Sequence, residues 1–229
     1  MIKSAQDVPR AEIVFYGVIL GKYALLIDGG FLIRKLTTRN RFPQADQIEA
    51  FARKVCDDPR FDDHELLRIY FYHAEPYAGK MKNPISRKEM NYADTPTYAN
   101  HKRLIDNLEL RYNFAVRLGE INARSWKLGS KAAKDIFSNP REVQAQDLVP
   151  VIEQKGVDLR IALDISRLSL CHLVESIIVV TGDSDFIPAF KFARREGIRV
   201  YLVTLNHGVK RDLKVHVDVL LDDITVGED

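Results

Sequence analysis

The sequence predicts an α/β protein built on a mostly parallel β-sheet. Short, continuous apolar runs such as Tyr23–Ile27 and Ser176–Val180 are typical of strands that are buried on both faces. Segments with apolar residues at helical spacing alternate with these runs, which indicates crossover units. The length of 229 residues, with 46% apolar and 29% charged residues, suits one large domain or two small ones.

In the first half of the chain, the strand over Tyr23–Ile27 is expected to stop at a tight turn, Asp28-Gly29-Gly30. Pro43 is expected to open a helix, because proline is tolerated at the first helical position. The further elements expected here are a strand over Leu66–His73, an irregular loop over 75–97, a helix over about 98–111 and a strand over Phe114–Leu118.

In the second half, Glu142–Gln154 has a helical pattern, and Asp158 begins a longer helical segment. The buried strand Ser176–Val180 runs directly into Thr181-Gly182-Asp183-Ser184-Asp185. A helix over about Ser184–Glu196, closed by Gly197, and a strand over Arg199–Val203 complete the alternation.

Repeats and obvious linkers are absent from the sequence, so we expect a single domain over residues 23–221 with a basic inserted loop at about 75–97. An N-terminal extension (1–22) and an acidic C-terminal tail (222–229) would flank it. The apolar run Ile13–Ile27 is shorter than the ~20 residues of a membrane-spanning helix, and we expect strands broken at Gly21-Lys22. Two cysteines without metal-binding spacing indicate a reducing compartment, and a cytoplasmic location without membrane contact is expected.

The net charge of +2 hides an uneven distribution. Residues 80–134 hold twelve Lys/Arg against five Asp/Glu, a net +7, and residues 191–216 hold seven against two, a net +5. Two basic segments indicate a polyanionic partner such as nucleic acid, although solvated surface charge explains them about equally well. The cations that we expect at a phosphate backbone are Lys80, Lys82, Arg124, Lys127, Lys210 and Arg211.

Acidic residues follow the ends of predicted strands or begin predicted helices. Asp28 ends the first strand, Asp183 and Asp185 follow the strand over Ser176–Val180, and Asp158 starts the helix before it. In an open α/β sheet, the carboxyl ends of the strands border the ligand crevice. Carboxylates brought together there repel one another unless a cation neutralises them, and oxygen-only ligands favour Mg²⁺ or Mn²⁺. Such a site predicts metal-assisted phosphodiester hydrolysis.

Each acid also has a structural interpretation. Asp183, Asp185 and Asp158 could cap the helices that they begin. Asp28 has no obvious helix to cap, which favours a functional role. Asp164 is expected to form an ion pair with Arg160 or Arg167 on its own helix.

Other candidate sites are weaker. His73, His207 and His216 are scattered. His73 could lie near the crevice, although a structural role explains it better; His207 and His216 stand near basic residues and could meet phosphates, although a surface role explains them at least as well. Trp126, next to the basic residues Arg124 and Lys127, could stack on a base or belong to the core. The sequence has no GxxxxGK[ST] loop, which argues against a P-loop nucleotide hydrolase.

Three stretches together resemble the NYN domain family of the PIN-like nucleases, and its LabA-like branch in particular. They are LLIDGGFL (25–32), KGVDLRIALDI (155–165) and VVTGDSDFIPAF (179–190), so that the resemblance extends from Tyr23 to about Leu220. It implies a three-layer α/β/α sandwich, an acidic pocket for Mg²⁺ or Mn²⁺, and ribonuclease activity.

On the matching positions, the resemblance implies that Asp28, Asp158, Asp183 and Asp185 are catalytic and hold the metal. The supporting residues that it implies are Asp164, Gly29, Gly182 and Ser184, with Lys155 near the phosphate. Phe31 stands where many members of the family have Asn.

We therefore expect a metal-dependent ribonuclease whose partner is RNA. The alternative is a non-catalytic RNA-binding or protein-binding regulator, which the Phe31 departure favours. A Toprim-like phosphotransfer domain is a third interpretation, but it would need a glutamate where the early strand has Asp28. The oligomeric state, including a homo-oligomer, stays open.

Overall fold

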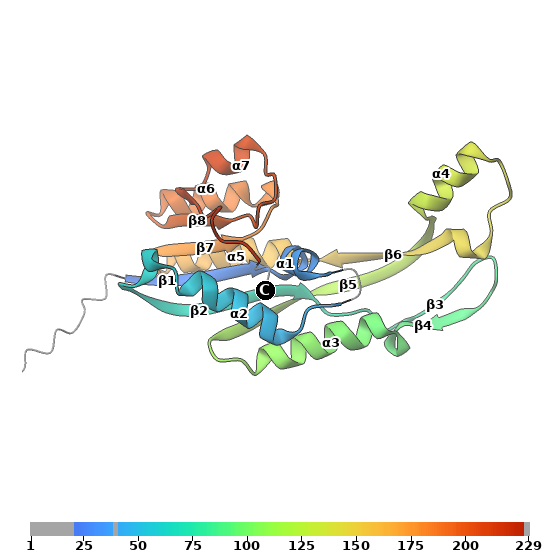
Figure 1. Ribbon diagram of the computed structural model, residues 1–229, viewed down its shortest axis with the longest axis horizontal. Coiled ribbons are helices and arrows are strands. Elements are labelled where there is room, and N and C mark those ends of the chain that lie inside the picture. Colours follow the sequence, from blue (N-terminus) through green and yellow to red (C-terminus); the bar gives the residue numbers. More distant parts are fainter. Residues whose placement is uncertain (1–20, 39–40, 227–229) are drawn as a thin grey trace, which may run out of the picture.

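The computed structural model describes residues 21–38 and 41–226. Its centre is a seven-stranded sheet with the strand order β6-β5-β2-β1-β7-β8-β9 (Figure 1). The strands are β1 (Gly21–Asp28), β2 (His64–Ala74), β5 (Phe114–Leu128), β6 (Leu148–Lys155), β7 (Ser176–Val180), β8 (Arg199–Val203) and β9 (Val219–Leu220). Within this sheet, only the β5–β6 pairing is antiparallel among the described residues.

Helices cover both faces of this sheet, which confirms the predicted α/β class with three layers. One face carries α1 (Gly29–Leu36), α2 (Ala45–Cys56) and α3 (Pro96–Glu109), and the other carries α5 (Val157–Leu170), α6 (Ile187–Arg195) and α7 (Arg211–Val215). Strand β1 contributes Leu25 and Ile27 to one core and Ala24 and Leu26 to the other. Burial on both faces explains why this strand is continuously apolar.

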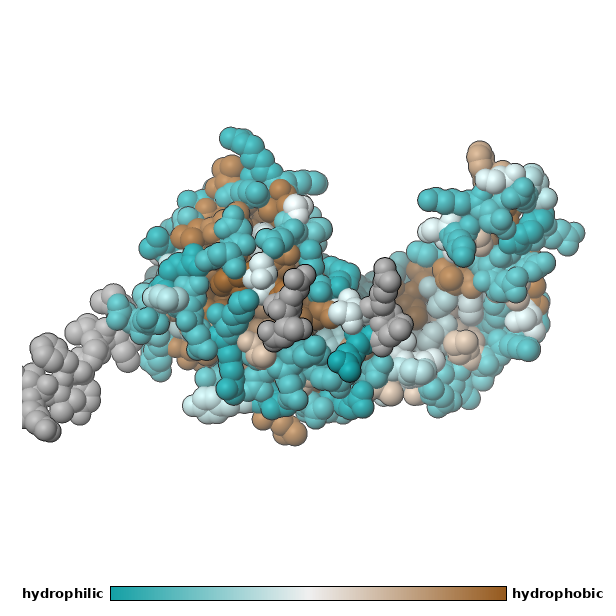
Figure 2. Space-filling view, viewed as in Figure 1, coloured by the Kyte–Doolittle hydropathy of each residue, from teal (hydrophilic) through white to brown (hydrophobic). Residues whose placement is uncertain are grey.

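The antiparallel pair β5–β6 reaches away from the body of the sheet. It carries α4 (Ser130–Ser138) at its far end, and the small hairpin β3 (Lys80–Lys82) and β4 (Glu89–Asn91) lies beside it (Figure 1). We call these elements the arm. Figure 2 shows that the surface is hollowed between the body and the end of the arm that bears α4.

The predicted helix over Glu142–Gln154 is wrong. The segment forms a 3₁₀ turn, η3 (Ala145–Asp147), followed by β6. Its apolar residues are mainly β-branched, which favours a strand. Pro150 is tolerated there because β6 is an edge strand, where a missing N–H breaks no ladder.

Two further expectations are corrected. The Asp28-Gly29-Gly30 segment is not a simple turn but the start of helix α1. The strand from Phe114 does not stop at Leu118 but continues to Leu128, so that Arg124, Trp126 and Lys127 lie on the arm. Strand β1 begins at Gly21 and includes Lys22, and the predicted break in the run Ile13–Ile27 stays a prediction because residues 13–20 lie outside the described residues.

The other predicted elements are confirmed with shifts of a few residues at their ends. The helix predicted to end before Gly197 is split into the 3₁₀ turn η4 (Ser184–Phe186) and α6, and Gly197 has φ +83° just after it. The predicted loop over 75–97 contains β3, β4 and the 3₁₀ turn η2 (Tyr92–Asp94).

Residues 1–20 of the predicted N-terminal extension lie outside the described residues, and so do residues 227–229 of the predicted acidic tail. The domain boundaries at 22 and 222 stay predictions. No helix in the described part of the chain is long and apolar enough to span a membrane.

Candidate active site

The order of the strands reverses at β1. From β1 the chain proceeds to β2 and β5 on one side, and later to β7 and β8 on the other. The carboxyl ends of β1 and β7 therefore border a topological switch point, where open α/β sheets bind their ligands. Ile27 pairs with Val180 at the ends of these strands, so that Asp28 and Thr181 emerge beside one another.

Asp28 is held by two hydrogen bonds. Its Oδ1 accepts from the backbone N–H of Phe31 (3.0 Å), which makes Asp28 the N-cap of α1, and its Oδ2 accepts from the hydroxyl of Thr181 (3.3 Å). The expectation that Asp28 caps no helix is therefore wrong, because the sequence pattern did not indicate a helix beginning at Gly29. Burial raises the pKa of Asp28, and the charge of Asp158 raises it further.

The turn after β7 is tied to the same threonine. The hydroxyl of Thr181 accepts from the backbone N–H of Asp183 (3.2 Å), and Asp183 Oδ1 accepts from the N–H of Asp185 (2.9 Å). Asp183 is thus the cap of η4, as the structural interpretation of the sequence expected. Its side chain is exposed, and so is that of Asp185.

Asp158 lies in the first turn of α5, behind the left-handed N-cap residue Gly156. Burial raises its pKa, and the charges of Asp183 and Asp185 raise it further. The charge of Asp158 also raises the pKa of Asp28, so each of the four predicted carboxylates lies near enough to another for their charges to interact. The topology has brought together residues that are up to 157 positions apart in the sequence.

A preformed metal cradle is nevertheless not seen. Within residues 21–38 and 41–226, no three His, Cys, Asp or Glu side chains are close enough together to hold a metal ion. The expectation that these carboxylates share one closed site is corrected in this respect. The carboxylates gather as a neighbourhood of negative charge at the switch point.

A pocket of ≈ 320 Å³ opens at this place, and it contains both charge signs. Asp28 and Asp183 line it together with three basic side chains, Arg34, His207 and Lys210. Of these three basic side chains, we expected Lys210 at a phosphate and considered His207 there beside a surface role. Arg34 was not predicted, because its place in the pocket depends on helix α1.

The loop after β8 delivers His207 through a strained turn. Leu205 and Asn206 have φ of +51° and +55°, and the N–H of His207 donates to the carbonyl of Thr204 (2.8 Å). These are the features of a type I′ turn, which is unusual for a buried leucine. Strain of this kind is often kept where it positions a functional side chain.

The predicted supporting role of Gly29, Gly182 and Ser184 stays a prediction, and the structure shows what surrounds each of them. A Cβ on Gly29 would lie 2.5 Å from the carbonyl oxygen of Tyr72, and one on Gly182 would lie 2.7 Å from His207 Cδ2, so both glycines allow close packing of the protein itself. Ser184 lines the pocket. Phe31 is buried against His207, with ring centroids 5.8 Å apart.

Asp164 does not join the carboxylates. Its Oδ2 accepts from the hydroxyl of Tyr72 (2.9 Å) and from Arg117 Nε (3.3 Å), so the ion pair comes from β5 and not from Arg160 or Arg167 as expected. Arg160 instead donates from Nε to the carbonyl of Leu118 (2.7 Å). A structural role therefore explains Asp164.

The predicted phosphate-binding cations are divided among three places. Lys210 lines the pocket, and Arg211 follows it at the start of α7. Lys155 ends β6, two residues before α5 begins. The remaining four lie on the arm and do not line the pocket: Lys80, Lys82, Arg124 and Lys127.

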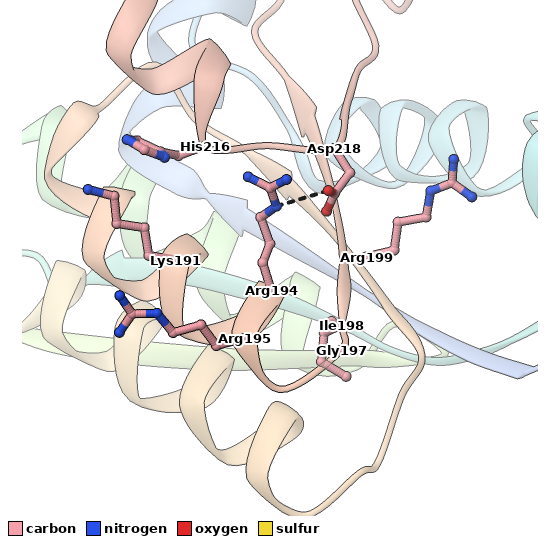
Figure 3. A pocket seen from close by; sticks show the side chains of 8 residues that line it. All are labelled: Lys191, Arg194, Arg195, Gly197, Ile198, Arg199, His216 and Asp218. Atoms are coloured by element: carbon pink, nitrogen blue, oxygen red, sulfur yellow. Dashed lines mark hydrogen bonds and ion pairs between the residues drawn. The ribbon is translucent and has the colours of Figure 1, made fainter.

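A larger cavity of ≈ 790 Å³ lies elsewhere, at the amino edge of the sheet where β8 begins (Figure 3). It is strongly basic: the cations that line it are Lys191, Arg194, Arg195 and Arg199, and His216 lies beside them. Asp218 accepts from Arg194 Nε at 2.9 Å. Much of the positive charge of residues 191–216 is therefore on the edge opposite to the switch point.

The family model of the NYN domain matches residues 80–222, which is more than half of the chain and includes Asp158, Asp183 and Asp185, but not Asp28. Among solved structures, a protein of unknown function from Vibrio parahaemolyticus is 15% identical with a TM-score of 0.47, over 90% of this chain and 95% of its own. MurG from Acinetobacter baumannii is 13% identical with a TM-score of 0.35, over 87% of this chain and 40% of its own. No curated protein matches the chain.

Proposed function

We propose that this chain, which belongs to the NYN domain family, is a metal-dependent ribonuclease of the LabA-like branch. NYN domains are usually nucleases of the PIN-like group, so a nucleic acid substrate and a hydrolase activity follow from the family. The branch rests on the motifs around Asp28, Asp158 and Asp183. The RNA substrate, the metal and the identity of the catalytic residues are our proposals.

One observation carries the proposal. Asp28 and Asp183 line the same pocket as Arg34, His207 and Lys210, at the switch point of the sheet. Cations beside carboxylates are what hydrolysis of a phosphodiester needs, because the substrate is an anion and would otherwise be repelled by the acids.

The donor set suits Mg²⁺ or Mn²⁺, because it consists of carboxylate oxygens alone. Burial and mutual repulsion raise the pKa values of Asp28 and Asp158, and a bound cation would relieve that repulsion. We propose that Asp28, Asp158, Asp183 and Asp185 hold the ion. When bound, it supplies a water of lowered pKa and stabilises negative charge on the phosphoryl oxygens.

The residues of the chain divide the remaining work. Arg34 and Lys210 bind the non-bridging phosphate oxygens. His207, which the strained turn at Leu205 and Asn206 holds at the pocket, contacts the phosphate and helps to position it. Asp28 is oriented by the N–H of Phe31 and the hydroxyl of Thr181, which keeps it facing the pocket. The exposed Asp183 and Asp185 turn can adjust to the substrate.

The test is cleavage of labelled single-stranded and structured RNA in the presence of Mn²⁺ or Mg²⁺. Asp183→Asn is the decisive variant, because an asparagine oxygen can still accept the N–H of Asp185 and keep the turn, while the charge is lost. Asp63→Asn is the matched control, because Asp63 is exposed and precedes β2 at the opposite edge of the sheet.

We expect cleavage by the unmodified protein and by Asp63→Asn, and a loss of at least about 100-fold in Asp183→Asn, which is comparable to the removal of one electrostatic stabiliser from an active site. Titration with Mn²⁺ should show saturable uptake that Asp183→Asn weakens. If the unmodified protein cleaves no RNA, or if Asp183→Asn cleaves as fast, the proposal is wrong.

The second candidate function is a non-catalytic RNA-binding regulator. Two observations favour it: Phe31 occupies a position where many relatives have Asn, and no three metal-binding side chains are preassembled among the described residues. RNA binding without cleavage, unchanged by Asp183→Asn, would support this function in place of the first.

A further inference from the structure

A second enclosed pocket, of ≈ 330 Å³, lies where the arm joins the body. Its walls come from the end of β2, the segment up to η2, the start of α3 and the paired strands β5 and β6. The aromatic side chains that line it are His73, Tyr77, Tyr92, Tyr98 and His101. The proposed catalytic residues do not line this pocket, which we call the aromatic pocket.

Two histidines form one wall. His73 Nε2 and His101 Nδ1 are 2.8 Å apart, and the rings stack with centroids 5.0 Å apart and an angle of 8° between their planes. Burial lowers the pKa of His73 to about 4 and also lowers that of His101, so this wall is uncharged at neutral pH. His73 is only 3% exposed, and its Nδ1 has no hydrogen-bond partner among the described residues. Such an unsatisfied nitrogen is an exception in native structures.

Three tyrosines also line the aromatic pocket. Tyr77 and Tyr92 contact each other with ring centroids 5.4 Å apart, and both are only partly buried. Tyr98 stands in the first turn of α3, where its N–H donates to the Thr95 cap (3.2 Å) and fixes the start of the helix. Aromatic side chains from the loop after β2, from η2 and from α3 therefore line one space.

The chemistry of the lining selects a neutral, planar group. No Lys, Arg, Asp or Glu lines the aromatic pocket in the part of the chain that the structure describes, while Thr97 and Gln154 offer polar atoms at its rim. Residues 80–134, which supply half of this lining, carry a net charge of +7. A neutral ring attached to a polyanion fits both the uncharged lining and the positive charge of residues 80–134. An apolar peptide side chain fits only the uncharged lining.

The aromatic pocket is also close to the proposed catalytic centre. Asp28 pairs with Tyr72 across β1 and β2, and His73 is the next residue of β2. Adjacent strands are about 4.8 Å apart, so the backbone that carries His73 neighbours the backbone that carries Asp28 at the same edge of the sheet. Both pockets are thus within reach of one nucleic acid strand.

We propose that the aromatic pocket binds a single unpaired nucleobase of the RNA and thereby selects single-stranded substrate beside the proposed cleavage site. This inference rests on the proposed RNA substrate. Stacking of a base on the tyrosines supplies the affinity, and the rim amides and hydroxyls contact the edge of the base. It gives the arm a role in positioning the strand.

The test measures binding without cleavage. Short single-stranded oligoribonucleotides that carry one 2-aminopurine are titrated with the full chain in metal-free buffer, and quenching of the 2-aminopurine fluorescence reports stacking. The variant is Tyr98→Ala, the conservative variant is Tyr98→Phe, and the matched control is Tyr112→Ala, because Tyr112 is 85% exposed and lies outside the aromatic pocket. Circular dichroism and thermal melting check that each variant is folded.

We expect quenching by the unmodified protein, by Tyr98→Phe and by Tyr112→Ala. Tyr98→Ala should weaken binding roughly 5- to 150-fold, the effect of losing one base–aromatic stack. An RNA with an abasic site in place of 2-aminopurine should lose affinity to a similar degree, and this loss should not add to that of Tyr98→Ala.

Equal affinity for the abasic RNA, or a folded Tyr98→Ala variant that binds like the unmodified protein, would overturn the proposal. Such a result would point to a peptide side chain as the occupant. The two proposals can fail separately, because this assay needs neither metal nor turnover. If the protein stacks the base here but cleaves no RNA in the separate assay with Mn²⁺ or Mg²⁺, the proposed ribonuclease activity is wrong and the base-binding pocket stands.

Discussion

Asp28 combines a structural and a proposed chemical role, and two substitutions separate them. Asp28→Asn keeps Oδ1 to accept the Phe31 N–H, and its amide NH2 replaces Oδ2 and can donate to the Thr181 hydroxyl oxygen, whereas Asp28→Ala removes both hydrogen bonds. Loss of an N-cap costs about 1 kcal/mol, and loss of the second bond costs about 0.5–1.5 kcal/mol. We therefore expect Asp28→Ala to be about 1.5–2.5 kcal/mol less stable than Asp28→Asn.

The pH dependence has a definite sign. An unfolded aspartate has a pKa of about 3.9, and burial and the charge of Asp158 raise the pKa of Asp28 above that value in the folded protein. The folded state therefore holds the proton more tightly, and the contribution of Asp28 to stability falls as the pH rises through this window. Asp28→Asn lacks this loss, so its stability relative to the unmodified protein should increase from acid to neutral pH.

The assay is urea unfolding between pH 4 and pH 7, combined with RNA cleavage and Mn²⁺ titration. Both variants should lose cleavage and weaken Mn²⁺ uptake, although only Asp28→Ala is destabilised by the loss of the cap. Equal stability of the two variants would refute the capping argument. Full cleavage by Asp28→Asn would refute a metal-binding role of this carboxylate.

Three other predictions concern the surroundings of the site. Gly29→Ala should destabilise the protein by about 1–3 kcal/mol in urea unfolding, because its Cβ would lie 2.5 Å from the carbonyl oxygen of Tyr72. Gly30→Ala should be neutral or stabilising, because its Cβ would meet nothing nearer than 3.4 Å. Equal effects of the two substitutions would contradict the close-packing argument. The pKa of His73 is about 6.5 in the unfolded chain and about 4 in the folded protein. The free energy of unfolding should therefore drop by about 3 kcal/mol as the pH falls from 6.5 to 4, and by less in His73→Phe. An identical pH profile for His73→Phe would disprove this role of His73. For single-stranded RNA, Lys210→Gln should reduce the steepness of the plot of log binding constant against log salt concentration by about 0.7. Lys22→Gln, at the amino edge of the sheet, should leave this slope unchanged. An unchanged slope for Lys210→Gln would show that Lys210 does not contact a phosphate.

The strands of the body could be predicted because burial on both faces leaves a continuous apolar run in the sequence of each strand. Tyr23–Ile27 and Ser176–Val180 are continuously apolar since helices cover both faces of the sheet at these positions. The helix ending before Gly197 was marked by a residue that tolerates a positive φ. These signals need no knowledge of distant residues.

The arm and α1 could not be predicted in the same way. The segment over Glu142–Gln154 is a strand because its partner is the extended end of β5, and pairing between strands leaves little trace in one segment alone. Helix α1 is short and begins with two glycines, which have low helix propensity, so its cap and its burial against β2 decide that it forms.

The sequence by itself determined the fold class. It also showed that Asp28, Asp158, Asp183 and Asp185 stand at strand ends or helix starts, because these are local properties of the chain. Only the tertiary structure decided which groups share a pocket: Arg34 and His207 join Asp28 and Asp183, while Asp164 pairs with Arg117 instead. The reason is physical. The order of strands in the sheet and the strained turn before His207 set distances between residues that are remote in the chain, and no local pattern of residues encodes those distances.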